Sequence, residues 1–141
     1  MRDEKGFSLI ELLVVIAVLG LIASIAVPNL RRARQSAYSS SAIQSMRTIT
    51  TAEVLYERKF KEYGVLADLA PEGTLDPYLS VGNKGHYTFV ITLSVDKLHY
   101  TVTATPTLEP TEMTYFFSDE STVIRYNVGA AADASSEPIP K

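Results

Sequence analysis

Residues 5–34 read KGFSLIELLVVIAVLGLIASIAVPNLRRAR, and this stretch determines how the rest of the chain is interpreted. From Phe7 to Val27, only Ser8, Glu11 and Ser24 carry polar side chains. As a helix rising about 1.5 Å per residue, these 21 residues would be about 31 Å long, enough to cross a hydrocarbon core of about 30 Å. A carboxylate in such a segment is costly unless it finds a partner, so Glu11 needs an explanation.

Two ordinary interpretations of this segment compete. A cleaved secretory signal needs a basic start, an apolar core of roughly 7–15 residues and a small-x-small cleavage site. Here two acidic residues offset the basic ones near the start, and the apolar run is longer, although the sequence ASIA at 23–26 resembles a cleavage site. A plain single-span anchor explains everything except Glu11.

The string KGFSLIE at residues 5–11, followed by the apolar run, resembles the N-terminus of type IV prepilins and of type II secretion pseudopilins. The resemblance extends over residues 5–28. It implies that a prepilin peptidase cleaves between Gly6 and Phe7 on the cytoplasmic face and methylates the new amine of Phe7. It also implies that Glu11 meets the N-terminal amine of a neighbouring subunit in a filament core. Pairing the two charges offsets both desolvation penalties, so the pair would fix register more than it adds stability.

Pro28 and Gly20 weaken the helix at two points. Pro28 lacks a backbone donor and clashes with the preceding turn, while glycine costs about 1 kcal/mol relative to alanine in a helix interior. Either Pro28 ends the membrane helix, or one long helix continues through it. The resemblance favours the long helix, so we expect a helix in the isolated subunit and some local melting between Gly20 and Pro28 after assembly.

Beyond Asn29 the helical pattern continues as an amphipathic segment to residue 63. Residues recur at spacings of four and three, which is typical of one buried stripe on a helix. The members of this stripe are Ala42, Met46, Ile49, Glu53, Tyr56, Phe60 and Tyr63. Glu53 is the polar exception, and we expect it at the edge of the stripe. Gly64 is the expected stop.

A basic cluster, RRAR at residues 31–34, follows the apolar segment. Positive charge normally stays on the cytoplasmic side, which alone would keep the following domain inside the cell. The pilin resemblance places that domain outside. A solvated or subunit-facing patch is one interpretation, and a lipid-headgroup or nucleic-acid role is another. The formal net charge of −3 argues weakly against nucleic acid.

The C-terminal half changes to a period of two. Alternating apolar and polar residues predict strands within 86–95 and 98–105, joined at Asp96-Lys97, and a second hairpin from 113–118 and 123–128. One face of this sheet is apolar and must be covered, and the helix stripe is the large apolar surface available to cover it.

We therefore predict an α+β fold, in which a long N-terminal helix, its apolar half protruding, carries a four-stranded antiparallel sheet packed on its C-terminal half. The expected divisions are a cleaved leader (1–6), an apolar transmembrane or filament-core half of the helix (7–28), its amphipathic half (29–63), a connecting loop (64–85), the sheet (86–128) and a mobile tail (129–141).

The sequence does not suggest an enzyme, a cofactor or a metal site. The adjacent Asp119 and Glu120 would point apart, which is wrong for paired acid–base chemistry. His86 and His99 are expected on polar faces of neighbouring strands, where they could approach each other, but no third ligand has a recognisable spacing. The same acidic pair is insufficient to assign a calcium site. The chain has no cysteine, so it has no disulfide and no thiol chemistry.

The predicted function is a structural subunit of a type IV pilus used in adhesion, twitching motility or DNA uptake. The processing residues would be Gly6 and Phe7, and the assembly residues Phe7, Glu11, Gly20 and Pro28. Expected partners are other copies of the chain in a helical homopolymer, the prepilin peptidase, the inner-membrane assembly platform, membrane lipid before assembly, and other pilins as further possible partners. The location would be the inner membrane, then a surface filament or a periplasmic pseudopilus. A type II secretion pseudopilin or minor pilin, and a membrane-anchored binding module that does not polymerise, are the alternatives.

Overall fold

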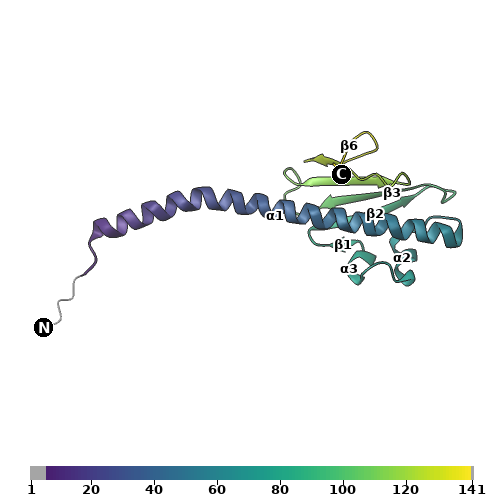
Figure 1. Ribbon diagram of the computed structural model, residues 1–141, viewed down its shortest axis with the longest axis horizontal. Coiled ribbons are helices and arrows are strands. Elements are labelled where there is room, and N and C mark those ends of the chain that lie inside the picture. Colours follow the sequence, from purple (N-terminus) through teal and green to yellow (C-terminus); the bar gives the residue numbers. More distant parts are fainter. Residues whose placement is uncertain (1–5, 141) are drawn as a thin grey trace. The chain divides into compact units, whose positions relative to one another are not determined.

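The computed structural model describes residues 6–140 and begins with one long helix, α1, from Leu9 to Phe60 (Figure 1). Residues 1–5 of the expected leader and Lys141 of the expected tail lie outside the described residues. The helix continues through Pro28, so of the two possibilities left open by the sequence, the long helix is the one observed. The chain divides into two compact units between Ser36 and Ala37, and each is described by itself.

The helix ends at a residue other than the expected one. After Phe60, Lys61 takes a left-handed backbone conformation with φ of 61°, and its N–H reaches the carbonyl of Glu57 at 2.7 Å. The prediction of a stop at Gly64 is therefore wrong by a few residues. Gly64 is needed for space instead, because a Cβ there would lie 3.0 Å from the Cβ of Asp68 and 3.2 Å from the Tyr56 ring.

The second unit contains a six-stranded antiparallel sheet in which each strand pairs with the next along the chain, in the order β1 to β6. The α+β prediction is confirmed, but the predicted number of strands is too small. The two additional strands are β1 (Asn83–Lys84) and β6 (Glu137–Pro138). Each has two residues, too few to produce a detectable alternation.

The four longer strands form the two predicted hairpins. β2 (Tyr87–Leu93) pairs with β3 (Tyr100–Pro106), and β4 (Thr114–Asp119) pairs with β5 (Arg125–Val128). Burial alternates along β2 and along most of β3, as a sheet covered on one face requires.

The core of the second unit lies between the sheet and α1. The helix contributes Ala42, Met46, Ile49 and Ala52, all at most 2% exposed. The sheet contributes Tyr87, Phe89, Tyr100, Val102, Ala104 and Phe116. Removing these apolar surfaces from water is the main stabilising term of the unit.

Two members of the predicted stripe behave differently from expectation. Phe60 is 45% exposed, because it is the last helical residue. Glu53 lies at the centre of the stripe and is fully buried, so the prediction that it occupies an edge is wrong. Glu53 follows Ile49 by four residues and therefore shares its face of the helix.

The connection between α1 and the sheet is built of short elements: α2 (Leu66–Leu69), the 3-10 turn η1 (Ala70–Glu72) and α3 (Pro77–Ser80). Leu69 and Leu79 are fully buried and extend the core. The C-terminal segment also contributes, since Ile139 packs against the core and Ala132 is buried.

Candidate assembly site

The predicted processing residues lie just before the first helical turn. Gly6 and Phe7 have no regular structure, and the Phe7 side chain is 89% exposed. A Cβ added at Gly6 would meet nothing within 4 Å. Both residues are therefore accessible in the single chain.

Glu11 serves the start of its own helix. Its carboxylate accepts the backbone N–H of Ser8 at 2.9 Å. Ser8 directly precedes α1, and a carboxylate three residues further on that accepts this N–H is one half of a capping box. The Ser-x-x-Glu spacing of Ser8 and Glu11 is the sequence signal for this cap.

The segment from residue 7 to residue 30 exposes a continuous apolar surface. Every large apolar side chain in it is at least 49% exposed; these are Phe7, Leu9, Ile10, Leu12, Leu13, Val14, Val15, Ile16, Val18, Leu19, Leu21, Ile22, Ile25, Val27 and Leu30. α1 contains an apolar window long enough to span a membrane, and none of that window is buried. A large exposed apolar surface marks contact with lipid or with another protein.

Three residues within this apolar segment, Ser24, Gly20 and Pro28, differ from its large apolar side chains. The Ser24 hydroxyl donates to the carbonyl of Leu21 at 2.7 Å, so it does not enter an apolar environment unpaired. Gly20 leaves open space where a side chain would be. Pro28 leaves the carbonyl four residues before it, that of Ser24, without its helical donor.

The basic cluster follows this surface on the same helix. Arg32 and Arg34 are exposed, as is Arg31. The guanidinium groups of Arg32 and Arg34 are therefore accessible to anionic partners, whether carboxylates or phosphates.

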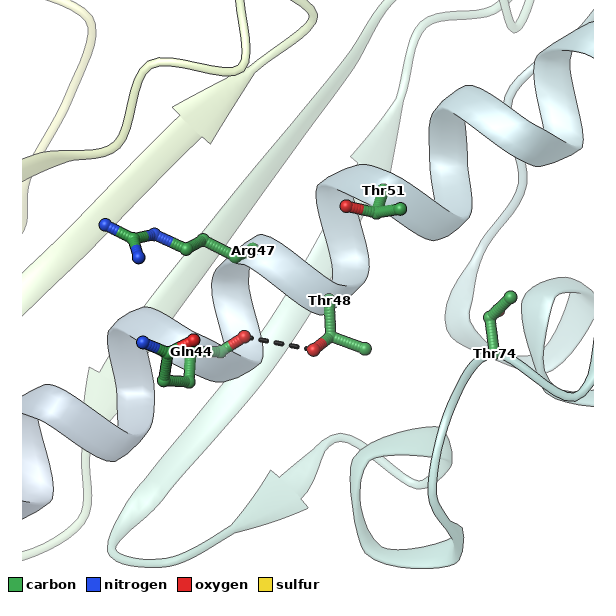
Figure 2. A pocket seen from close by; sticks show the side chains of 5 residues that line it. All are labelled: Gln44, Arg47, Thr48, Thr51 and Thr74. Carbon is green, nitrogen blue, oxygen red and sulfur yellow. Dashed lines mark hydrogen bonds between the residues drawn. The ribbon is translucent and has the colours of Figure 1, made fainter.

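A shallow hollow of about 310 Å³ lies on the second unit (Figure 2). Four lining residues come from α1, namely Gln44, Arg47, Thr48 and Thr51, and the fifth, Thr74, comes from the connection between α1 and the sheet. The Thr48 hydroxyl donates to the Gln44 carbonyl at 3.0 Å. The lining has one cationic side chain, Arg47, and no carboxylate. It therefore contains neither an acid–base pair nor a set of metal ligands.

The two histidines are far apart in the ladder. His86 precedes β2 and packs edge-on against Tyr38, with ring centroids 4.3 Å apart. His99 precedes β3, and its Nδ1 lies 2.8 Å from Glu120. Because the strands are antiparallel and Tyr87 pairs with Pro106, the starts of β2 and β3 lie at opposite ends of the hairpin. The expectation that the histidines approach each other is wrong. Within residues 6–140, no group of three or more metal-binding side chains gathers.

Comparisons with known proteins agree on the N-terminal segment. The family model described as the prokaryotic N-terminal methylation motif matches residues 1–27. The type IV wide pilus major component PilA4 of Thermus thermophilus is 42% identical over 62 residues, which cover 44% of this chain and 41% of that protein.

Other relatives are secretion proteins. The type II secretion system core protein G of Escherichia coli is 31% identical over 88 residues, covering 60% of this chain and 61% of that protein. The protein of the same name from Vibrio cholerae is 29% identical over 123 residues, covering 68% and 84%. The match to the first two relatives thus spans roughly half of their length.

Four observations agree. They are the exposed apolar segment of the long helix, the antiparallel sheet, the methylation motif and the similarity to these relatives. The chain carries a prokaryotic N-terminal methylation motif and is similar to type IV pilins and to type II secretion core proteins, which supports a pilin-like structural subunit.

Proposed function

We propose that this chain is a structural subunit of a type IV pilus, made as an inner-membrane precursor and polymerised through the apolar segment of α1. The observation that carries the proposal is the complete exposure of that segment in the single chain. An apolar surface of this size needs an apolar environment, which lipid supplies to the precursor and copies of the same helix supply to the filament.

Processing would occur at the junction of Gly6 and Phe7. A peptidase must reach an extended, accessible peptide bond, and among the described residues Gly6, Phe7 and Ser8 have no regular structure, which supports such access. Cleavage would produce an N-terminal amine on Phe7, four residues before Glu11. The amine, after methylation, would then be the partner of the Glu11 carboxylate on a neighbouring subunit.

Gly20 and Pro28 would let the apolar segment change conformation during assembly. Both lie in the continuous helix of the single chain, and each removes a source of helix stability. Local melting between them would lengthen the subunit while the rest of α1 stays helical.

The partners of such a subunit are its own copies, the prepilin peptidase, the inner-membrane assembly platform, membrane lipid before assembly and, in mixed filaments, other pilins. The final location would be a cell-surface filament. Adhesion, twitching motility and DNA uptake are the functions of such filaments that this subunit would serve.

A second candidate function is that of a pseudopilin in a type II secretion system, or of a minor pilin. It is favoured by the relatives named core protein G, one of which aligns over 84% of its length. A pseudopilin would be confined to a short periplasmic filament. Co-purification with secretion components, and loss of enzyme secretion after deletion of the gene, would distinguish it from a pilus subunit.

The proposal is tested by mass spectrometry on sheared surface filaments. A subunit that begins at Phe7 and carries the extra mass of one methyl group supports both processing and assembly. If the protein is found only as an intact, membrane-bound monomer in cells that export filaments, it is a membrane-anchored binding module that does not polymerise.

A further inference from the structure

Glu53 is a fully buried carboxylate that neither the fold nor the proposed assembly explains. It lies on the face of α1 that packs against the sheet, next to Ile49 and Ala52. An apolar residue at this position would continue the stripe. A buried carboxylate without a counter-ion is costly, so a specific role should offset that cost.

Only one of its two oxygens is satisfied. Oε2 accepts the backbone N–H of Gly64 at 3.1 Å, whereas Oε1 is buried and has no hydrogen-bond partner among the described residues. The hydrogen bond crosses from the helix to the turn after it. Glu53 thereby fastens the segment Lys61–Gly64 to the core.

The groups that face Glu53 do not stabilise a negative charge. The Tyr100 hydroxyl on β3 lies close enough for the charge of Glu53 to raise its pKa, and it is buried with no hydrogen-bond partner among the described residues. The Tyr63 ring packs on Tyr100, with centroids 4.6 Å apart. From α2, Asp68 adds a further negative charge. Within the described part of the chain, no cation forms an ion pair with Glu53.

Burial raises the pKa of Glu53 from 4.5 to about 7, with a smaller contribution in the same direction from Asp68. The N–H of Gly64 opposes the shift, since it favours the ionised form. Burial and the charge of Glu53 also raise the pKa of Tyr100, so this tyrosine stays neutral and supplies no charge to the site at neutral pH.

The segment 61–64, which Glu53 fastens to the core, is also bonded to the turn between β2 and β3. The N–H of Tyr63 donates to the carbonyl of Lys97 at 2.9 Å, and the Lys97 ammonium lies 3.3 Å from Glu62. Lys61 and Lys97 both have left-handed backbone conformations, which are unfavourable for residues with a side chain. These two turns, 61–64 and 94–99, form a joint surface that we call the tip.

We propose that Glu53 is a proton-operated latch for the tip: the neutral carboxyl holds the turn 61–64 against the core, and ionisation releases it. In the neutral carboxyl, Oε2 can still accept the Gly64 N–H while Oε1 carries the proton, so no charge is buried. Once the proton leaves for solvent, the carboxylate gains stability by moving toward water, and the Gly64 and Tyr63 contacts loosen with it. The tip would be fixed in mildly acidic medium and mobile in alkaline medium.

The direction of the pH effect follows from proton linkage. The closed state binds the Glu53 proton more tightly than an opened or unfolded state does. The stabilisation is therefore complete below the unfolded pKa and is lost as pH rises through the folded pKa of about 7.

Amide hydrogen exchange on the full chain in detergent micelles tests the latch at Gly64 and Tyr63. After correction for the intrinsic rate, we expect protection at these amides to fall about tenfold between about pH 6 and pH 8 in the native chain. Glu53→Gln keeps an oxygen acceptor for Gly64 but does not titrate, so its protection should be independent of pH. Glu57→Gln, one turn along α1, should behave like the native chain. Equal pH dependence in the native chain and in Glu53→Gln would overturn the proposal.

A second measurement needs no variant. Carbon-13 labelling of glutamate side chains reports the titration of each carboxyl group by NMR, and a buried group that titrates near neutrality supports the latch. If every glutamate of the chain titrates below about pH 5.5, the proposal fails.

Discussion

The carboxylate of Glu11 accepts the backbone N–H of Ser8 over 2.9 Å, across the first turn of α1. In the single chain, the Glu11 carboxylate therefore already has a hydrogen-bond partner, whereas in the proposed filament it would pair with an amine. A negative charge in the first turn also opposes the positive end of the helix dipole. Filament assembly would exchange this local interaction for an intermolecular one, so two substitutions are needed to separate the roles.

Glu11→Gln should abolish or strongly reduce filaments while leaving the helix start intact, because the amide oxygen still accepts the Ser8 N–H but carries no charge. Glu11→Ala should reduce filaments and also destabilise the first turn by up to about 1 kcal/mol. The measurement is the amount of subunit in sheared filaments relative to the membrane fraction. Native filament yield in Glu11→Gln would show that the charge is dispensable.

Gly20→Ala should strengthen the isolated helix by up to about 1 kcal/mol, because the new methyl group meets no atom within 4 Å. If the segment from Gly20 to Pro28 melts during assembly, the same change should lower filament yield. Helix content in micelles is read by circular dichroism and yield by shearing. As a matched control, Ala17→Gly weakens the helix outside that segment and should leave assembly efficient. Unchanged yield in Gly20→Ala would argue against local melting.

Ile49→Ala should destabilise the second unit by about 2–5 kcal/mol, because the side chain is fully buried between α1 and the sheet and its removal leaves a cavity. Leu55→Ala, on the same helix but 46% exposed, should cost much less. Thermal unfolding of the two variants in the same detergent gives the comparison. Similar losses would mean that the stripe is not the centre of the core.

Asp76 combines a helix cap with an ion pair. Its Oδ1 accepts the N–H groups of Tyr78 and Leu79, and Oδ2 lies 2.6 Å from the ammonium of Lys84. Asp76→Ala should cost about 1 kcal/mol through loss of the cap, whereas Asp76→Asn keeps the cap and loses only an exposed ion pair.

The Lys84 hydrogen bond lowers the pKa of Asp76, helped by the two backbone N–H groups and opposed by partial burial. Its contribution to stability is therefore present above the ordinary pKa of 3.8 and is lost as pH falls below it. The difference between the native chain and Asp76→Asn should shrink from pH 7 to about pH 3 in denaturant titrations. A constant difference would exclude the carboxylate as its source.

Much of the fold could be predicted from the sequence because its signals are periodic. The alternation in 86–95 and 98–105 depends on one covered face, and the structure forms β2 and β3 there. Strands β1 and β6 could not be predicted, because two residues are too few to show an alternation of apolar and polar side chains. Each forms by pairing with a neighbouring strand.

The errors concern residues whose environment comes from distant segments. Glu53 was expected at an edge because its chemistry is polar, but the stripe position set by Ile49 overrode that preference. Gly64 was expected to end the helix, because glycine often does so. In the structure, glycine is required there because a Cβ would crowd Tyr56 and Asp68. Within the candidate assembly site, the motif around Gly6, Phe7 and Glu11 could be recognised in the sequence, whereas the geometry proposed for a filament would depend on other chains.

The two-residue strands β1 and β6 have a consequence for crowded copies of this domain. They are the edge strands of the sheet, and very short edge strands are one of the ways in which native sheets limit pairing with another chain. Long bare margins would invite edge-to-edge aggregation. In the proposed filament, the short edge strands would thus limit contacts between the sheets of neighbouring subunits, and contact between subunits would be made through the apolar segment of α1.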